Sequence, residues 1–242
     1  MSTETSSLEV RGLHVDINRK DIANLHLGVY PPNGRVRVSA PLGVSDEAVR
    51  LAVIAKWSWI RRQRERFASQ QRLTPRDLVS GESHYLFGQR YRLRVTLTTR
   101  RPGVRLVNKS TLELQVGDGA TLAQRQSVME KWYRKCLCEA LEPLVDEWQH
   151  ELGVSADFWG LKRMKTKWGS CNPETRRIWF NSELAKKPRG CLQMLVVHEL
   201  VHLIVPNHGE DFAAMMNQTL PDWQSQREVL NSLPLAHDCW DY

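Results

Sequence analysis

The sequence predicts an α+β protein, and three patterns in its 242 residues support this class. Short stretches of alternating apolar and polar residues between positions 8 and 116 indicate β-strands. Longer apolar periodicities near residues 121–152 and 189–202 indicate helices. The turn-forming stretch 117–119, Gly-Asp-Gly, separates these two parts. We therefore expect two domains, residues 8–116 and residues 119–242.

The N-terminal domain is expected to be mainly β-structure around one helix. Apolar residues alternate over Val36–Ala40 and again over Tyr91–Leu97, as in strands with one buried face. The helix is expected to begin after Ser45, which can cap it, and to end near Phe67. We find no internal sequence repeat.

The C-terminal domain is expected to be helical with a small sheet. A long amphipathic helix should run from Thr121 to about Leu152, with a kink or break at Pro143. Two strands are expected near residues 160–165 and 177–181. A sheet packed beside helices belongs to the α+β class.

The next helix is expected between Pro188, which favours a first turn, and Pro206, which cannot continue a helix. Its last turns contain the motif H-E-x-x-H, formed by His198, Glu199 and His202. Residues four apart share a helix face, so both imidazoles can bind one metal ion, and Glu199 can take a proton from metal-bound water. The motif predicts a zinc hydrolase. The alternative is a pair of core histidines favoured by the negative end of the helix dipole.

His208 is the candidate third ligand, because a catalytic zinc typically has three protein ligands and one open position. Its spacing from His198 equals that of the metzincin motif, although Val205 stands where that motif has glycine. The alternative is a surface histidine, in which case Glu210 or Asp211 would be the next candidates. The other histidines are expected on the surface or in loops: His14, His26, His84, His150 and His237.

Further segments have a recognisable pattern around the motif: residues 163–171, 178–184, 197–203 and 221–223, and in the N-terminal half residues 40–45, 56–60 and 81–91. With these segments nearly the whole chain resembles the YgjP-like metallopeptidases, a bacterial and archaeal family in the neighbourhood of SprT-like and WLM-type proteases. The resemblance implies a zincin-like domain over residues 119–242. It also implies a protein or peptide substrate, Zn²⁺ bound by His198, His202 and His208, and Glu199 as the catalytic base.

The positive charge lies in the first half of the sequence. Residues 1–118 contain 20 Lys and Arg against 11 Asp and Glu, a net charge of +9, and residues 119–242 contain 14 against 16, a net charge of −2. The densest run is Arg61–Arg66, which follows Trp57 and Trp59. Basic residues beside aromatic ones can form a nucleic-acid surface, and the alternative is a solvated helix face. Arg100, Arg101 and Arg105 are expected in an exposed hairpin.

Two functional hypotheses follow. The first is a zinc metallopeptidase, and the second is a nucleic-acid-associated binding module with a structural or vestigial zinc site. Glu199 favours the first, because a structural zinc site needs no neighbouring carboxylate and usually has a fourth protein ligand.

A cytoplasmic protein is expected, with no membrane segment, because the first residues are polar and no apolar run has the length of a membrane span. The five cysteines have no disulfide-framework spacing. Cys171 is expected to be a small, buried apolar residue.

Overall fold

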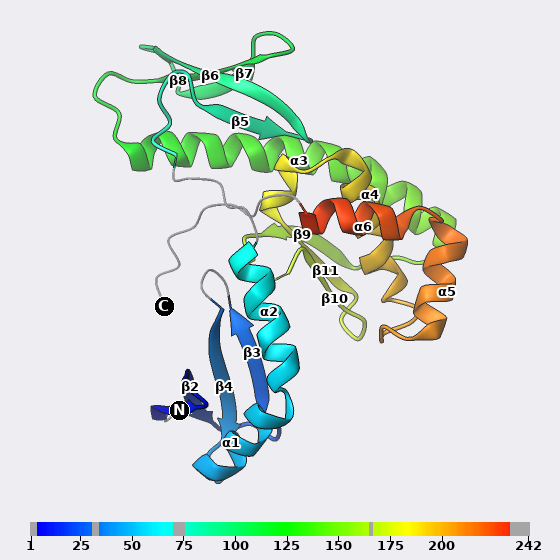
Figure 1. The fold of residues 1–242 in the computed structure, drawn as a ribbon. Coiled ribbons are helices and arrows are strands. Elements are labelled where there is room, and N and C mark those ends of the chain that lie inside the picture. Colours follow the sequence, from blue (N-terminus) through cyan, green and yellow to red (C-terminus); the bar gives the residue numbers. More distant parts are fainter. Residues whose placement is uncertain (1–3, 31–33, 70–75, 165–166, 233–242) are drawn as a thin grey trace. The chain divides into compact units, whose positions relative to one another are not determined.

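Two compact units make up the protein, which is described here by a computed structural model (Figure 1). The structure describes residues 4–30, 34–69, 76–164 and 167–232. The chain divides between residues 72 and 73, and each unit has its own hydrophobic core. Helices and several small sheets confirm the α+β class. None of the helices in the described ranges has the length and apolar character needed to cross a membrane.

The first unit is a four-stranded sheet with two helices. The strands lie in the order β1 (Glu4–Val10), β2 (Leu13–Lys20), β4 (Arg35–Pro41) and β3 (His26–Tyr30). The central pair β2–β4 is parallel and the outer pairs are antiparallel. The helices are α1 (Asp46–Ala55) and α2 (Trp57–Ser69). The core residues come from both layers and include Val15, Ile17, Val36, Val38, Val49, Val53 and Ile60.

The single helix expected from Ser45 to Phe67 is two helices. Ser45 caps α1 as expected, because its side chain accepts a hydrogen bond from the backbone N–H of Ala48. The chain leaves helical geometry at Lys56, where φ is −101° and ψ is 14°, and α2 begins at the next residue. No glycine or proline marks this break, so the local pattern does not reveal it.

The second unit begins with another four-stranded sheet, in the order β5 (Ser83–Leu86), β6 (Gln89–Leu97), β8 (Thr111–Val116) and β7 (Gly103–Leu106). This sheet packs on α3 (Leu122–Leu152). A three-stranded sheet follows, in the order β10 (Gly169–Asn172), β11 (Arg177–Asn181) and β9 (Phe158–Lys162). The remaining elements are the 3-10 helix η1 (Ser182–Lys186) and the helices α4 (Arg189–Val201), α5 (Glu210–Thr219) and α6 (Trp223–Ser232).

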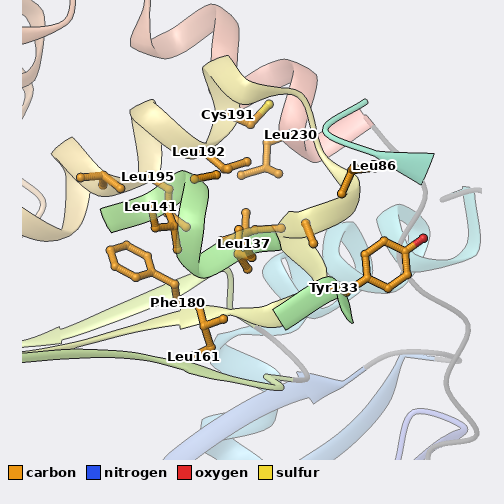
Figure 2. Packing of buried hydrophobic residues seen from close by; sticks show 14 of the residues in the cluster. Leu86, Tyr133, Leu137, Leu141, Leu161, Phe180, Cys191, Leu192, Leu195 and Leu230 are labelled. Carbon is orange, nitrogen blue, oxygen red and sulfur yellow. The ribbon is translucent and has the colours of Figure 1, made fainter. Parts of the chain in front are cut away.

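The long helix α3 packs against both sheets of this unit and against α4. Figure 2 shows Leu137 and Leu141 of α3 packed among Leu192 of α4, Phe180 of β11 and Leu230 of α6. Thr121 and Gln124 form a full capping box at its start, and the helix continues through Pro143 without interruption. The predicted helix is therefore confirmed, but no break occurs at the proline.

The division between the units differs from the boundary expected at residues 117–119. Those residues form the turn between β8 and α3, inside the second unit. Leu93 and Leu114 of the second four-stranded sheet belong to the same apolar cluster as Leu137 and Phe180, so the sheet cannot be separated from the helical part. Residues 1–72 carry 12 Lys and Arg against 7 Asp and Glu, and residues 73–237 carry 22 against 18. The positive charge is therefore not confined to the first unit.

The two four-stranded sheets have the same topology, a repeat that the sequence does not show. In both, a central parallel pair is flanked by antiparallel strands in the same order. Each first hairpin turns through two residues with positive φ, Arg11-Gly12 at 52° and 76° and Phe87-Gly88 at 48° and 82°. Each sheet leads into a helix capped by a hydroxyl residue, Ser45 or Thr121. Different side chains build the same arrangement twice.

Candidate metal centre

The H-E-x-x-H motif lies at the end of α4, a helix buried along most of its length. The helix begins directly after Pro188, as expected, and ends at Val201 with His202 as its C-cap. It therefore ends several residues before Pro206. The backbone N–H groups of Leu203 and Ile204 bond to carbonyls three residues earlier, which makes a tight turn. This turn directs the chain back toward the motif.

Three imidazoles converge at this turn. The Nε2 atom of His208 lies 3.0 Å from Nε2 of His198 and 3.2 Å from Nε2 of His202. The nitrogen atoms of all three residues lie within 4.8 Å of one another, and this is the one group of metal-binding character found among the described residues. The structure thus brings together all three histidines that the sequence identified.

Neighbouring groups fix the orientation of the rings. The Nδ1 atom of His202 lies 3.1 Å from the carbonyl oxygen of Val205, so a proton on Nδ1 leaves the Nε2 lone pair free for a metal. Phe212 of α5 packs against all three imidazoles, with ring centroids 4.9, 4.7 and 4.8 Å from those of His198, His202 and His208. The sequence analysis did not predict helix α5, so it did not predict that Phe212 would pack against the imidazoles.

The three imidazoles are held in their neutral form. Burial, together with the smaller effects of the nearby rings of His202 and His208, lowers the pKa of His198 to about 3. Burial also lowers the pKa of His202 and of His208. Neutral imidazoles offer lone pairs, which is the form that binds metal ions.

The carboxylate of Glu199 is buried beside the histidines, with 3% of the residue exposed. Burial raises the pKa of Glu199 to about 8, and the positive charge of Lys167 opposes this rise. Gly169 at the start of β10 lies directly against the carboxylate. A Cβ atom at Gly169 would lie 2.8 Å from Cδ of Glu199 and closer still to its Oε1. A side chain at this position would therefore have to displace the carboxylate of Glu199.

Asn181 holds the segment that precedes Gly169. Its Nδ2 donates hydrogen bonds to the carbonyl oxygens of Met164 and Lys167, both at 2.8 Å, and its Oδ1 accepts one from the backbone N–H of Glu183. The residue is 4% exposed, so these contacts satisfy a buried amide. Sequence spacing assigned no role to Asn181. The structure shows that it fixes the path of the chain beside the carboxylate.

Trp168 and Cys171 lie on either side of Gly169. The ammonium group of Lys187 lies 5.2 Å from the ring centroid of Trp168, a cation–π contact between this segment and the start of α4. Cys171 is partly buried and packs on the main core, and burial raises the pKa of its thiol to about 11. A protonated thiol at neutral pH agrees with the expected apolar role.

One of the other histidines differs from the expectation. His84 was expected in a loop or on the surface, but it lies on β5 with 7% of the residue exposed. Its Nε2 lies 3.2 Å from Oε2 of Glu82, a polar partner that compensates its burial. His14, His26 and His150 are exposed, as expected. His237 lies outside the described residues.

The fold and this cluster are typical of one class of protein, an α+β metallopeptidase with two histidines and a glutamate at the end of one buried helix and a third histidine in the loop that follows. A family model described as YgjP-like, metallopeptidase domain, matches residues 25–233. The chain belongs to the YgjP-like metallopeptidase family. Membership implies a metal ion and protein or peptide substrates.

The comparisons with curated proteins and with solved structures add no further assignment. The comparison with curated proteins gives no match. Among solved structures, the metallopeptidase zymogen jannalysin of Methanocaldococcus jannaschii is 20% identical, with a TM-score of 0.34. That match covers 37% of this chain and 92% of jannalysin.

A methyl group at Gly169 should displace the glutamate. We expect Gly169→Ala to retain its metal content but to lose about 100-fold in peptide hydrolysis, because a displacement of about 1 Å at a reacting group can have this effect. Gly117→Ala is the control, since a Cβ atom there meets nothing within 4 Å. Metal analysis and initial rates measure both. Equal rates for the two variants would show that the contact has no role in hydrolysis.

The buried carboxylate should also make the metal-free protein less stable as the pH rises. The pKa of Glu199 is about 8 in the folded protein against an ordinary 4.5, so the unfolded chain releases the proton first and stability falls between these values. The pKa of His198 is about 3 against 6.5, so its contribution is constant above pH 6.5. Between pH 6.5 and 8 the protein should lose at most about 2 kcal/mol relative to Glu199→Gln. Urea unfolding in chelator measures this, and parallel pH profiles would contradict it.

Proposed function

We propose that the protein is a zinc-dependent metallopeptidase in which His198, His202 and His208 bind Zn²⁺ and Glu199 is the general base. The convergence of three imidazole nitrogens within 4.8 Å, beside a buried carboxylate, carries this proposal. Three neutral nitrogen ligands with one position left for water are typical of a catalytic zinc. Tetrahedral ligands about 2.05 Å from zinc lie about 3.3 Å apart, close to the 3.0 and 3.2 Å between these nitrogens.

The protein's own groups account for the proton transfers. A zinc ion bound by the histidines supplies the Lewis acidity that activates both the attacking water and the scissile carbonyl. Glu199 accepts a proton from the water as its oxygen bonds to the carbonyl carbon, and then donates that proton to the leaving amine as the C–N bond breaks. The pKa of about 8 is that of Glu199 in the metal-free protein, and the positive charge of a bound zinc ion would lower it, so that the carboxylate is charged and can accept the proton.

Strand β10 is the proposed docking edge for the peptide. It is an edge strand, and in the described part of the chain it pairs with β11 alone. The strand starts at Gly169, beside the carboxylate of Glu199. An extended peptide can add to such an edge through backbone hydrogen bonds, which would pass it in front of the proposed base.

The binding-module alternative gains little from the arginine run in α2. Arg61, Arg62 and Arg64 are exposed, and Arg61 pairs with Glu65 at 3.4 Å, four residues along the helix. This arrangement is a solvated helix face. A structural zinc site also gives no reason to bury Glu199 beside its ligands.

Replacing the ligands should remove the metal in a graded manner. We expect about one zinc per chain in the parent, none in His198→Ala or His202→Ala, and weakened binding in His208→Ala, whose residue lies in the loop rather than on the helix. His26 is an exposed histidine of β3, so the control variant His26→Ala should bind zinc with the affinity of the parent. Metal analysis and competition with a chelator measure this. Unchanged affinity in His208→Ala would remove it from the ligand set.

Glu199→Gln should separate metal binding from catalysis. The amide has nearly the size of the carboxylate but cannot accept the proton of the attacking water. We therefore expect normal zinc content and a roughly 100-fold to 10,000-fold loss in cleavage of an unfolded protein such as casein. Chelation should abolish the activity of the parent, and added zinc should restore it. Cleavage by Glu199→Gln at the parental rate would refute the assignment of the base.

A further inference from the structure

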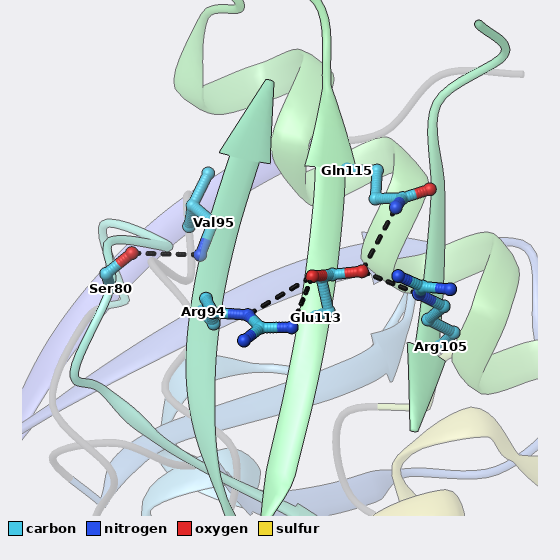
Figure 3. A network of polar contacts seen from close by, with 6 residues as sticks. All are labelled: Ser80, Arg94, Val95, Arg105, Glu113 and Gln115. Carbon is cyan, nitrogen blue, oxygen red and sulfur yellow. Dashed lines mark hydrogen bonds and ion pairs between the residues drawn. The ribbon is translucent and has the colours of Figure 1, made fainter. Parts of the chain in front are cut away.

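The outer face of the second four-stranded sheet is covered by arginines. Its inner face packs on α3 and belongs to the main core. On the central strand β6, alternate residues point outward, and three successive outward positions are Arg90, Arg92 and Arg94, all exposed. Arg105 of β7 and Glu113 of β8 complete this face (Figure 3). We call these four arginines the basic sheet face.

Glu113 organises two of the four guanidinium groups. Its Oε2 accepts a hydrogen bond from Nε of Arg105 at 2.6 Å, and its Oε1 accepts one from Nη2 of Arg94 at 2.7 Å. Nε2 of Gln115 donates a further bond to Oε2 (Figure 3). These bonds, with that of Arg105 the largest influence, lower the pKa of Glu113. A carboxylate that stays charged fixes Arg94 and Arg105 but neutralises only one charge.

The remaining arginines have no such compensation. Arg90 and Arg92 form no ion pair with any residue that the structure describes. Residues 83–116, the whole of this sheet, contain seven basic residues and one acidic residue, a net charge of +6 in a chain of net charge +7. The seven are Arg90, Arg92, Arg94, Arg100, Arg101, Arg105 and Lys109. This sheet and its connecting loops thus have a larger net positive charge than residues 1–72, which contain 12 basic residues against 7 acidic ones.

Folding alone does not explain this pattern. Charged residues on an edge strand protect it against aggregation, but β6 lies in the interior of the sheet. Residues two apart on a strand are about 6.8 Å apart on the same face, so the arginines repel one another. The exposed arginines of α2 differ, because one of them pairs with Glu65 of its own helix. A row of uncompensated like charges indicates an anionic partner.

We propose that the basic sheet face binds the phosphodiester backbone of nucleic acid. Guanidinium groups bind phosphate oxygens through paired hydrogen bonds, and a row of them along a strand suits a polymer with regularly repeated negative charges. Tyr91 of β6 is buried on the opposite face, whereas Tyr85 of β5 lies opposite Arg90 on the basic sheet face and is partly exposed. Stacking of a base on an aromatic ring is tolerant of sequence, as are contacts to phosphates, so binding is independent of sequence. It places a second binding surface on the unit that contains the metal centre and does not depend on the proposed catalysis.

The test compares two variants of the full-length protein that lose the same charge. Arg90→Gln with Arg92→Gln changes the basic sheet face and leaves the Glu113 network in place. Arg62→Gln with Arg64→Gln changes the exposed side of α2. Binding to labelled single-stranded and double-stranded oligonucleotides is measured by fluorescence anisotropy from about 50 to about 200 mM salt. Circular dichroism and urea unfolding verify that both variants are folded.

We expect the parent to bind at low salt and the sheet variant to bind at least about tenfold more weakly. The slope of log K against log salt should decrease by about 1.4 for single strands and about 1.8 for duplexes, since two phosphate contacts are lost. The α2 variant should keep the parental slope. Preference for either strand form supports the proposal and identifies the form bound.

Three outcomes would overturn the proposal. The first is no binding at low salt, and the second is an equal loss in both variants. The third is competition by polyglutamate as strong as that by unlabelled DNA. This last result would assign the face to acidic proteins.

Discussion

The structure around the metal centre depends on one constraint, the burial of a carboxylate and imidazoles at the end of an otherwise apolar helix. Helix α4 is buried on nearly every side, and Glu199 lies within that environment with 3% of the residue exposed. Burial of an ionisable group without a charged partner is costly, so its pKa moves to favour the neutral form. Desolvation also lowers the pKa of all three histidines, although His208 is the exposed member of the cluster. An environment that disfavours charge thus keeps the imidazoles neutral for metal binding and raises the proton affinity of Glu199.

The elements around α4 each contribute to this arrangement. Helix α3 supplies apolar side chains against which α4 packs, which fixes the position of the motif. Strand β10 reaches the carboxylate because Gly169 has no side chain, and Asn181 holds the segment before it. Phe212 of α5 covers the imidazoles from another direction. Rigid packing of this kind is what a preorganised site requires.

The repeated sheets show one topology with two different surfaces. Both bury a central parallel pair against helices, and both start with a hairpin of the same turn type. In the second sheet the outward positions of β6 are arginines, and a buried glutamate orders two guanidinium groups of this face. The core-facing residues determine the topology, so the outward residues are free to differ. This freedom explains how a structural repeat can acquire a charged surface on one copy.

The sequence by itself determined the features that depend on residues close together in the chain. The spacing of His198, Glu199 and His202 placed them on one helix face, Thr121 marked the start of α3, and His208 was identified as the third member of the cluster. The tertiary structure decided everything that depends on contacts between distant segments. Such contacts placed the division at residues 72 and 73 and buried His84 of β5. They also brought Phe212 and Gly169 to the metal centre. The physical reason is that helix periodicity and capping act within a few residues, whereas burial and close approach are properties of the packed chain.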